Sequence, residues 1–420
     1  MNAIPICQLR RIRDSISKLD EKFDLCLRTG TKNSYVFWLD TLCIPVARNL
    51  SAYRKKAIGL MGRTYHEATA VLVLDRELKE VDTRTTSFLE QSLWLVFSGW
   101  MRRLWTLQEA ALAQDLFIEM KDGPARYSRS EDGAILIPNK LKREQLKPAI
   151  SDPTPDILMY RELDLLIQRR IPLAQHLWEM SRPSEHQTPY QYLSAATESR
   201  CTSKLKDEPI ILATIMGQDV TELIEEQDDA RRMSMWHQSM GKIPADIIFL
   251  DSQIEKLEHA PFRWAPASLM ENEIARQTTD GVGVCDSDGL HVEFAGFILP
   301  DGQESHTTSV GEKWYLRDRG DGTVHKVRHE MTRTIPRRCA VLINLDRHRF
   351  GAVAEILSER QQNVMEGDGG CDASTTYFVA IVGLISFFKK KGLGPGKSVK
   401  LGREVLDCRR TSPAQKWCIT

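Results

Sequence analysis

The sequence predicts an α/β fold: a parallel sheet with flanking helices, followed by a helical region and a β-rich C-terminal region. Three observations support this prediction. Short apolar, β-prone runs alternate with helical patterns in the first part of the chain. Residues 156–242 have the pattern of helices, and after Phe262 strand-like runs are separated by Gly and Asp turns. We therefore expect three regions, 1–125, 126–260 and 261–420.

The first two elements have clear boundaries. Apolar residues recur at three- and four-residue steps over 8–29, which predicts an amphipathic helix that ends at Gly30. Residues 35–39 form a short run of aromatic and β-branched residues that ends at Asp40. This run predicts a buried strand.

The rest of the first region repeats the alternation of helix and strand. Its expected elements, in order, are a helix over 52–67, a strand over 70–74 ending at Asp75, a helix over 86–97, a helix from the N-cap Ser98 to about 114 and a strand over 116–120. Right-handed crossovers between the strands would make all three parallel and adjacent. Residues 121–155, rich in Pro, Gly and Lys, predict a long connection.

Composition excludes several classes of protein. The 420 residues include 57 Lys and Arg and 57 Asp and Glu, and this balance argues against a nucleic-acid partner. The longest apolar run, 377–388, is shorter than the ~20 residues that a membrane span needs, and we expect none. Nine scattered cysteines without zinc-ligand spacing predict reduced thiols, a cytoplasmic location and no metal site.

Three sequence blocks resemble those of the fungal heterokaryon-incompatibility (HET) domain. Residues 37–45 match its Trp-x-Asp-x-x-Cys-Ile block, with Trp38, Asp40 and Cys43 at the named positions. Residues 61–68 resemble its Met-x-x-Ile/Val-Tyr-x-x-Ala block, and 100–113 its Trp-x-x-Arg-x-Trp-Thr-x-Gln-Glu block. The similarity is strong over about 30–125 and looser over 190–300. It implies a protein of fungal non-self recognition and programmed cell death.

One block of the family has no counterpart. HET domains open with Leu-Ser-Tyr-x-Trp-Gly, and nothing similar precedes residue 35. The resemblance therefore implies a HET core over 1–125 that lacks its first block, with a helical continuation over 126–260.

HET domains are in turn distantly similar to TIR domains, some of which cleave NAD with a glutamate near a tryptophan. The resemblance implies Glu109 as the catalytic residue and NAD as a substrate, with Asp40, Trp38 and Arg103 as binding residues. A carboxylate beside an indole is desolvated, which raises its pKa, and it can stabilise an oxocarbenium-like ribose. We expect Glu109 near Asp40 or Trp38, at the strand ends where Asp75 also emerges.

Structural interpretations of the same residues stay open. Glu109 is also explained as a half-exposed helix residue with a hydrogen-bond or ion-pair role, and Asp40 as a cap or turn residue. Cys43 fits a small buried side chain. For the whole protein, the alternative is a catalytically inactive interaction module that binds protein partners or self-associates. We also expect Trp105 on the buried face of its helix, with Arg103 outside.

Overall fold

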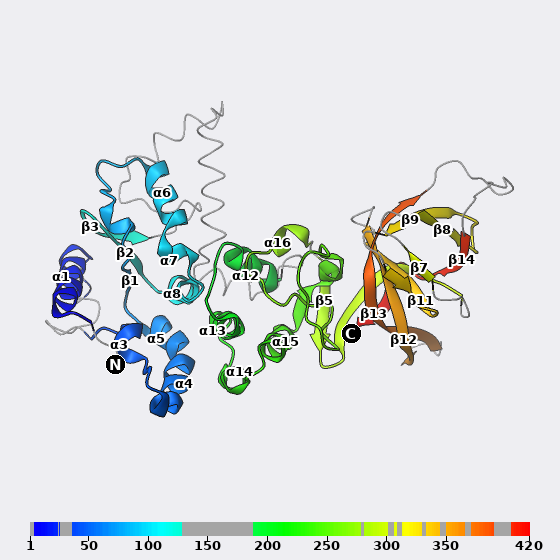
Figure 1. Cartoon of the computed structure of the whole chain (residues 1–420), viewed down its shortest axis with the longest axis horizontal. Helices are drawn as coiled ribbons and strands as arrows, with labels where there is room; N and C mark the ends of the chain where they lie inside the picture. Colours follow the sequence, from blue (N-terminus) through cyan, green and yellow to red (C-terminus); the bar gives the residue numbers. More distant parts are fainter. Residues whose placement is uncertain are drawn as a thin grey trace. The chain divides into compact units, whose positions relative to one another are not determined.

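The computed structural model describes residues 4–23, 25, 36–127, 188–278, 281–300, 306–308, 313–329, 333–344, 350–365, 371–389 and 405–420. The chain forms two compact units (Figure 1). The first comprises residues 1–182 and 192–232, and the second comprises residues 183–191 and 233–420. The first is mixed α/β, and most of the second is β-structure.

The N-terminal helix is confirmed over its described part. Helix α1 (Ile6–Phe23) has a buried Leu19, and the ring of Phe23 lies 4.8 Å from that of Phe117. The helix thereby covers one face of the first unit's sheet, as its apolar stripe requires. The expected end at Gly30 lies outside the described residues.

The strand expected at 35–39 is wrong in its described part. Residues 36–39 have no ladder partner among the described residues, and Val36 is 99% exposed. Leu39 has an extended backbone, with φ −141° and ψ 122°. Leu39 thus has the backbone conformation that a β-prone run favours, but the run is neither paired nor buried as a strand.

The sheet of the first unit is mixed. Strand β1 (Val71–Val73) pairs in parallel with β2 (Leu116–Met120), as expected for these two runs. The hairpin partner β3 (Gly123–Tyr127) then pairs antiparallel with β2. It begins within the expected connection, where Gly123 has the positive φ of 112° that glycine favours. The described part of the first unit thus has one parallel strand pair, not three parallel strands.

The expected helices are present, but two of them are broken. The observed segments are α4 (Ser51–Gly59), α5 (Met61–Glu67), α6 (Phe88–Phe97), α7 (Gly99–Arg102) and α8 (Thr106–Leu112). Ser98 caps α7 as expected, because its Oγ accepts from the amide of Met101 at 3.1 Å. Arg103 is extended, with ψ 132°, and ends that helix.

Short helices follow residue 188, as the sequence predicts for this region. They are α12 (Pro189–Thr197), α13 (Glu208–Ile215), α14 (Thr221–Glu225) and α15 (Asp229–Met240). The part of the expected helical region between 128 and 187 lies outside the described residues. In the first unit, α13 packs closely on α5: a Cβ added to Gly62 would lie 2.6 Å from the Thr214 methyl carbon. The glycine thus permits this contact.

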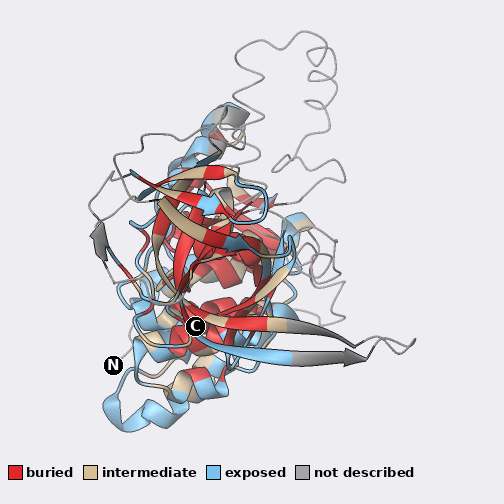
Figure 2. Cartoon of the chain, turned by 90° about the vertical axis from the view of Figure 1, so that its right-hand side faces the viewer, coloured by how far each residue is buried: buried red, intermediate tan, exposed pale blue. Residues whose placement is uncertain are grey.

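The β-rich C-terminal region is confirmed. Its strands are β4 (Lys242–Pro244), β5 (Val282–Asp286), β6 (Gly289–Ile298), β7 (His306–Thr308), β8 (Lys313–Asp318), β9 (Val324–His329), β10 (Arg333–Ile335), β11 (Cys339–Ile343), β12 (Phe350–Met365), β13 (Cys371–Lys389), β14 (Val405–Arg410) and β15 (Gln415–Ile419). Because β6 pairs with both β11 and β14, the order β6-β11-β12-β13-β9-β8-β14 closes into a ring. Figure 2 shows the buried residues of these strands around the centre of the ring.

Candidate functional site

Helix α8 carries Glu109, and its hydrogen bond to Trp100 fixes the carboxyl group. The indole Nε1–H of Trp100 donates to Glu109 Oε2 at 2.9 Å. Trp100 is 1% exposed, so its side chain is set in the core. Glu109 itself is half-buried. The sequence expectation of a carboxylate beside an indole therefore describes this pair, although the indole belongs to Trp100 and not to Trp105.

The environment of Glu109 favours its neutral form. Burial raises the pKa of the carboxyl group, and the charge of Asp40 raises it further. The Trp100 hydrogen bond and the charges of Arg103 and Arg200 act in the opposite direction, but burial is the largest effect. Such a carboxyl changes protonation nearer to neutral pH than an ordinary glutamic acid.

Tyr65 links Glu109 to the first sequence block. The ring of Trp38 meets the Tyr65 ring edge-on, with 5.5 Å between ring centres. Burial raises the pKa of the Tyr65 hydroxyl, and the charges of Glu109 and Asp40 raise it further. Asp40 is exposed and begins the short helix α3 (Asp40–Cys43), where its carboxylate accepts from the Thr41 hydroxyl at 3.1 Å. It therefore also has the turn role that the sequence left open.

Two arginines balance these carboxylates in different ways. Arg103 is exposed, as expected. Arg200 is fully buried, and its Nη1 donates to the carbonyl oxygen of Arg103 at 2.9 Å and to the Thr106 hydroxyl at 3.0 Å. Its Nε donates to the Ala196 carbonyl oxygen at 3.1 Å. Arg200 thus holds the break between α7 and α8 and places a cation near Glu109.

Asp75 has a structural role. Its Oδ1 accepts from the amides of Glu77 and Leu78 at 2.9 and 3.2 Å. Its Oδ2 accepts from the amide of Trp100 at 2.9 Å. The carboxylate therefore joins the end of β1 to the first turn of α7, and all three bonds are to backbone groups.

The structure brings together four of the residues singled out from the sequence. The Trp38 ring contacts Tyr65, and the charges of Glu109 and Asp40 act on the Tyr65 hydroxyl. The charges of Asp40 and Arg103 also act on the Glu109 carboxyl. The expectation for Cys43 is wrong, because its side chain is exposed. Trp105 is half-buried against the core, and its Nε1–H donates to Asp207 at 2.9 Å.

The sequence patterns did not single out Tyr65 and Arg200 as members of this cluster. Tyr65 occupies the tyrosine position of the second sequence block, so the resemblance of that block could have identified it. Arg200 is 91 positions from Glu109, and no local pattern identifies it as a buried cation. Only tertiary packing brings it to the α7–α8 break.

Two large cavities of the described chain lie away from this cluster. A groove of about 650 Å³ runs between α4 and α14 and is lined by Lys55, Lys56 and Ile224, among others. The second unit has a cavity of about 610 Å³ lined by parts of β5, β6 and β15. Within the described ranges, no three His, Cys, Asp or Glu side chains are placed to hold a metal ion, and no helix has the length and apolar character needed to cross a bilayer.

Comparison of the chain with protein-family models, with curated proteins and with solved structures finds no match.

Proposed function

We propose that the chain is a HET-domain protein with a TIR-like first region, which acts in the cytoplasm as an effector of fungal non-self recognition and programmed cell death. The three sequence blocks support this proposal. The residues they supply, Trp38, Asp40, Tyr65, Trp100 and Glu109, are distant in sequence and form one cluster. A structural role alone would account for each residue singly, but the shared location favours a common site.

The proposed reaction is hydrolysis of the bond between nicotinamide and ribose in NAD. This bond breaks with its electron pair leaving on the nicotinamide nitrogen, and water adds to the ribose carbon and releases a proton. The products are nicotinamide and ADP-ribose. A carboxylate held next to the ribose stabilises the oxocarbenium-like transition state. Glu109 is the candidate, because Trp100 orients its carboxyl group and burial strengthens its electrostatic effect.

The neighbours of Glu109 have complementary roles in this proposal. The exposed guanidinium of Arg103 would bind a phosphate oxygen of the pyrophosphate, and the Trp38 ring would pack against nicotinamide or ribose. Asp40 would accept from ribose hydroxyls. Its charge keeps the pKa of Glu109 raised.

The test incubates the full chain with NAD and measures the released nicotinamide by chromatography. Glu109→Gln keeps the size of the side chain and an acceptor for Trp100, and we expect it to lower the rate at least ~100-fold. The matched control is Glu67→Gln, because Glu67 is an exposed glutamate that pairs with Arg63 at 2.7 Å in the same unit. Equal rates for Glu109→Gln and the wild type would remove the enzymatic proposal.

A second candidate function, the interaction module, is favoured by a different observation. The elements α3, α4 and the short turn Arg48–Leu50 between them contain no buried residue. Residues 40–59, which hold these elements and the link between them, expose apolar side chains, among them Leu42, Val46, Leu50 and Tyr53. Exposed apolar side chains in such numbers mark association surfaces. Light scattering tests this candidate: Val46→Asp with Tyr53→Asp should abolish any self-association of the wild type, and the Glu67→Gln control should not.

A further inference from the structure

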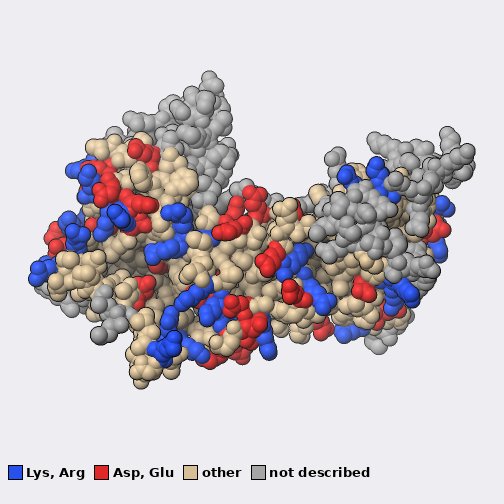
Figure 3. All heavy atoms as spheres, viewed as in Figure 1, with Lys and Arg blue, Asp and Glu red and all other residues tan. Residues whose placement is uncertain are grey.

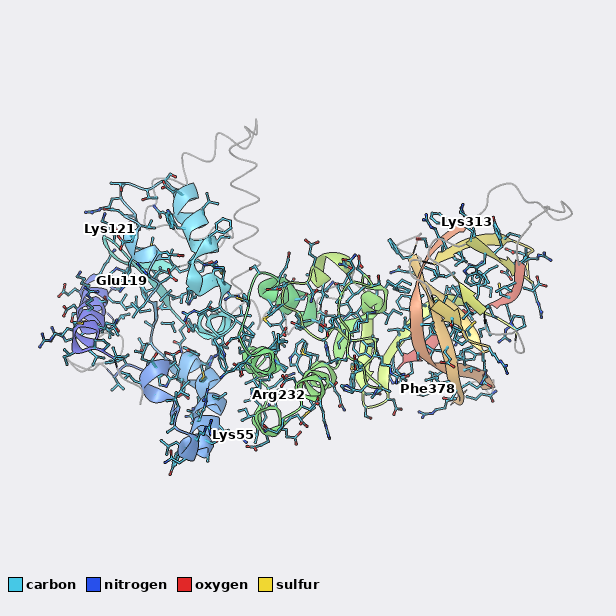
Figure 4. The ribbon with its side chains drawn as sticks, in the orientation of Figure 1. Lys55, Glu119, Lys121, Arg232, Lys313 and Phe378 are labelled. Atoms are coloured by element: carbon cyan, nitrogen blue, oxygen red, sulfur yellow. The ribbon has the colours of Figure 1, made fainter. Side chains whose placement is uncertain are left out.

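Strands β8 and β9 of this neutral chain have an excess of positive charge. Residues 313–328 contain five Lys or Arg and two Asp or Glu, and the described residues 405–410 contain two Arg and one Asp. In Figure 3, Lys and Arg side chains appear beside Asp and Glu at the described surface of this part of the chain. Figure 4 labels Lys313 at the start of β8. The balance over the whole chain, from which we expected no nucleic-acid partner, does not reveal this basic region.

Three residues on neighbouring strands form an aromatic–cation–aromatic row. In the ladder, Lys326 of β9 lies opposite Tyr315 of β8 and opposite Phe388 of β13. Residues paired in this way share one face of the sheet. The Lys326 ammonium lies 6.0 Å from the centre of the Phe388 ring, and Phe388 is exposed. The neighbouring residues along these strands point to the opposite face. They are buried in the core that the closed ring of strands surrounds: Trp314, Leu316, Val327 and Phe387. The row therefore lies on the outer face.

The next row on this face is doubly cationic. Lys313 and Arg328 lie two residues from Tyr315 and Lys326 along their strands, so they share the same face, and they are directly opposite each other. Both side chains are exposed. Like charges in directly opposed positions repel and destabilise a sheet. An anion bound across the two strands would relieve this repulsion.

We propose that this outer face, formed by Lys313, Tyr315, Lys326, Arg328 and Phe388, binds single-stranded nucleic acid. Tyr315 and Phe388 are two strands apart, about 10 Å, with a cation between them. Unpaired bases stack on such rings while lysine and arginine bind the intervening phosphates. A duplex keeps its base faces stacked and unavailable to the rings. An anionic membrane is less favoured, because two rings separated by a lysine provide little apolar area for insertion.

The experiment is fluorescence anisotropy of labelled oligo(dT) and oligo(U) of about 15 nucleotides, titrated with the full chain at several NaCl concentrations. The proposal requires saturable binding that weakens as salt rises. Arg328→Glu should weaken binding roughly tenfold or more and reduce the salt dependence. The double variant Tyr315→Ala/Phe388→Ala should weaken it by a similar factor while leaving the salt dependence unchanged.

The matched control is Lys242→Glu, an exposed cation of β4 in the same unit but away from this face, which should bind as the wild type does. Circular dichroism of each variant checks that the unit is folded. The proposal is overturned by absent binding at low salt, or by unchanged binding of the aromatic double variant, which would indicate unspecific attraction of a polyanion. Binding to vesicles with anionic lipid but to neither oligonucleotide would also overturn it.

Discussion

The indole of Trp100 and the carboxyl of Glu109 are joined by a 2.9 Å hydrogen bond that spans the break between helices α7 and α8. Trp100 also donates its backbone amide to Asp75. One buried residue therefore connects the end of a strand, the start of one helix and the candidate catalytic group on the next. The position of Glu109 thus depends on the packing of Trp100.

Trp100→Phe tests this dependence. Phenylalanine keeps most of the buried ring but has no N–H, so the hydrogen bond that lowers the pKa of Glu109 is lost and that pKa should rise further. We expect a loss of about 1–2 kcal/mol in the free energy of unfolding, measured by denaturant titration. The matched control is Trp105→Phe, which removes the hydrogen bond to Asp207 and should leave the pKa of Glu109 as it is. An unchanged Glu109 titration in Trp100→Phe would contradict this account.

Asp75→Ala should destabilise the first unit, because the role of Asp75 is structural and not chemical. The change leaves three backbone amides without their acceptor, those of Glu77, Leu78 and Trp100. The loss of a cap together with buried unsatisfied donors should cost about 2–4 kcal/mol. Glu77→Ala, an exposed neighbour, should stay within about 0.5 kcal/mol of the wild type. A loss of equal size in both variants would show that Asp75 has no special structural role.

The second unit should lose stability in acid because of His237. This buried side chain stacks on Tyr190 and meets Trp264 edge-on, and burial lowers its pKa to about 4. The unfolded chain binds a proton near pH 6.5, so the free energy of unfolding should fall between pH 6.5 and about 4, on the order of 3 kcal/mol in all. His237→Phe should flatten this part of the stability curve. A curve of the same slope in the variant would assign the acid sensitivity to another group.

Much of the fold followed from local patterns, and the failures have physical causes. The β-prone runs of β1 and β2 were sufficient, because these strands bury most of the residues that define their patterns. The periodicity of α1 also sufficed, and its apolar residues are partly buried around the buried Leu19. Residues 36–39 have the composition of a strand, but composition does not supply a partner strand. Pairing depends on a neighbouring strand edge and is not encoded in the run itself.

The broken helix after Ser98 shows how a side chain can override a helical pattern. The Thr106 hydroxyl donates to the backbone carbonyls of Trp100 and Arg103, and Arg200 binds the same hydroxyl and the Arg103 carbonyl. Threonine competes in this way for backbone groups, but its partner Arg200 is almost a hundred positions away. The sequence motifs likewise predicted Glu109, Asp40 and Trp38 as residues of the candidate site. Arg200 could be identified only from the tertiary structure.

The most direct test of the central claim is the pH dependence of nicotinamide release from NAD by the full chain between pH 4 and 8. The carboxylate of Glu109 is the active form in our account, so the rate should rise with pH, with a midpoint above the ordinary glutamic acid pKa of about 4.3. Trp100→Phe should move this midpoint up, and Asp40→Asn should move it down, following the causes of the raised pKa of Glu109. A wild-type rate that does not change across this range, or no release of nicotinamide at any pH, would contradict the assignment of Glu109 as a catalytic carboxylate.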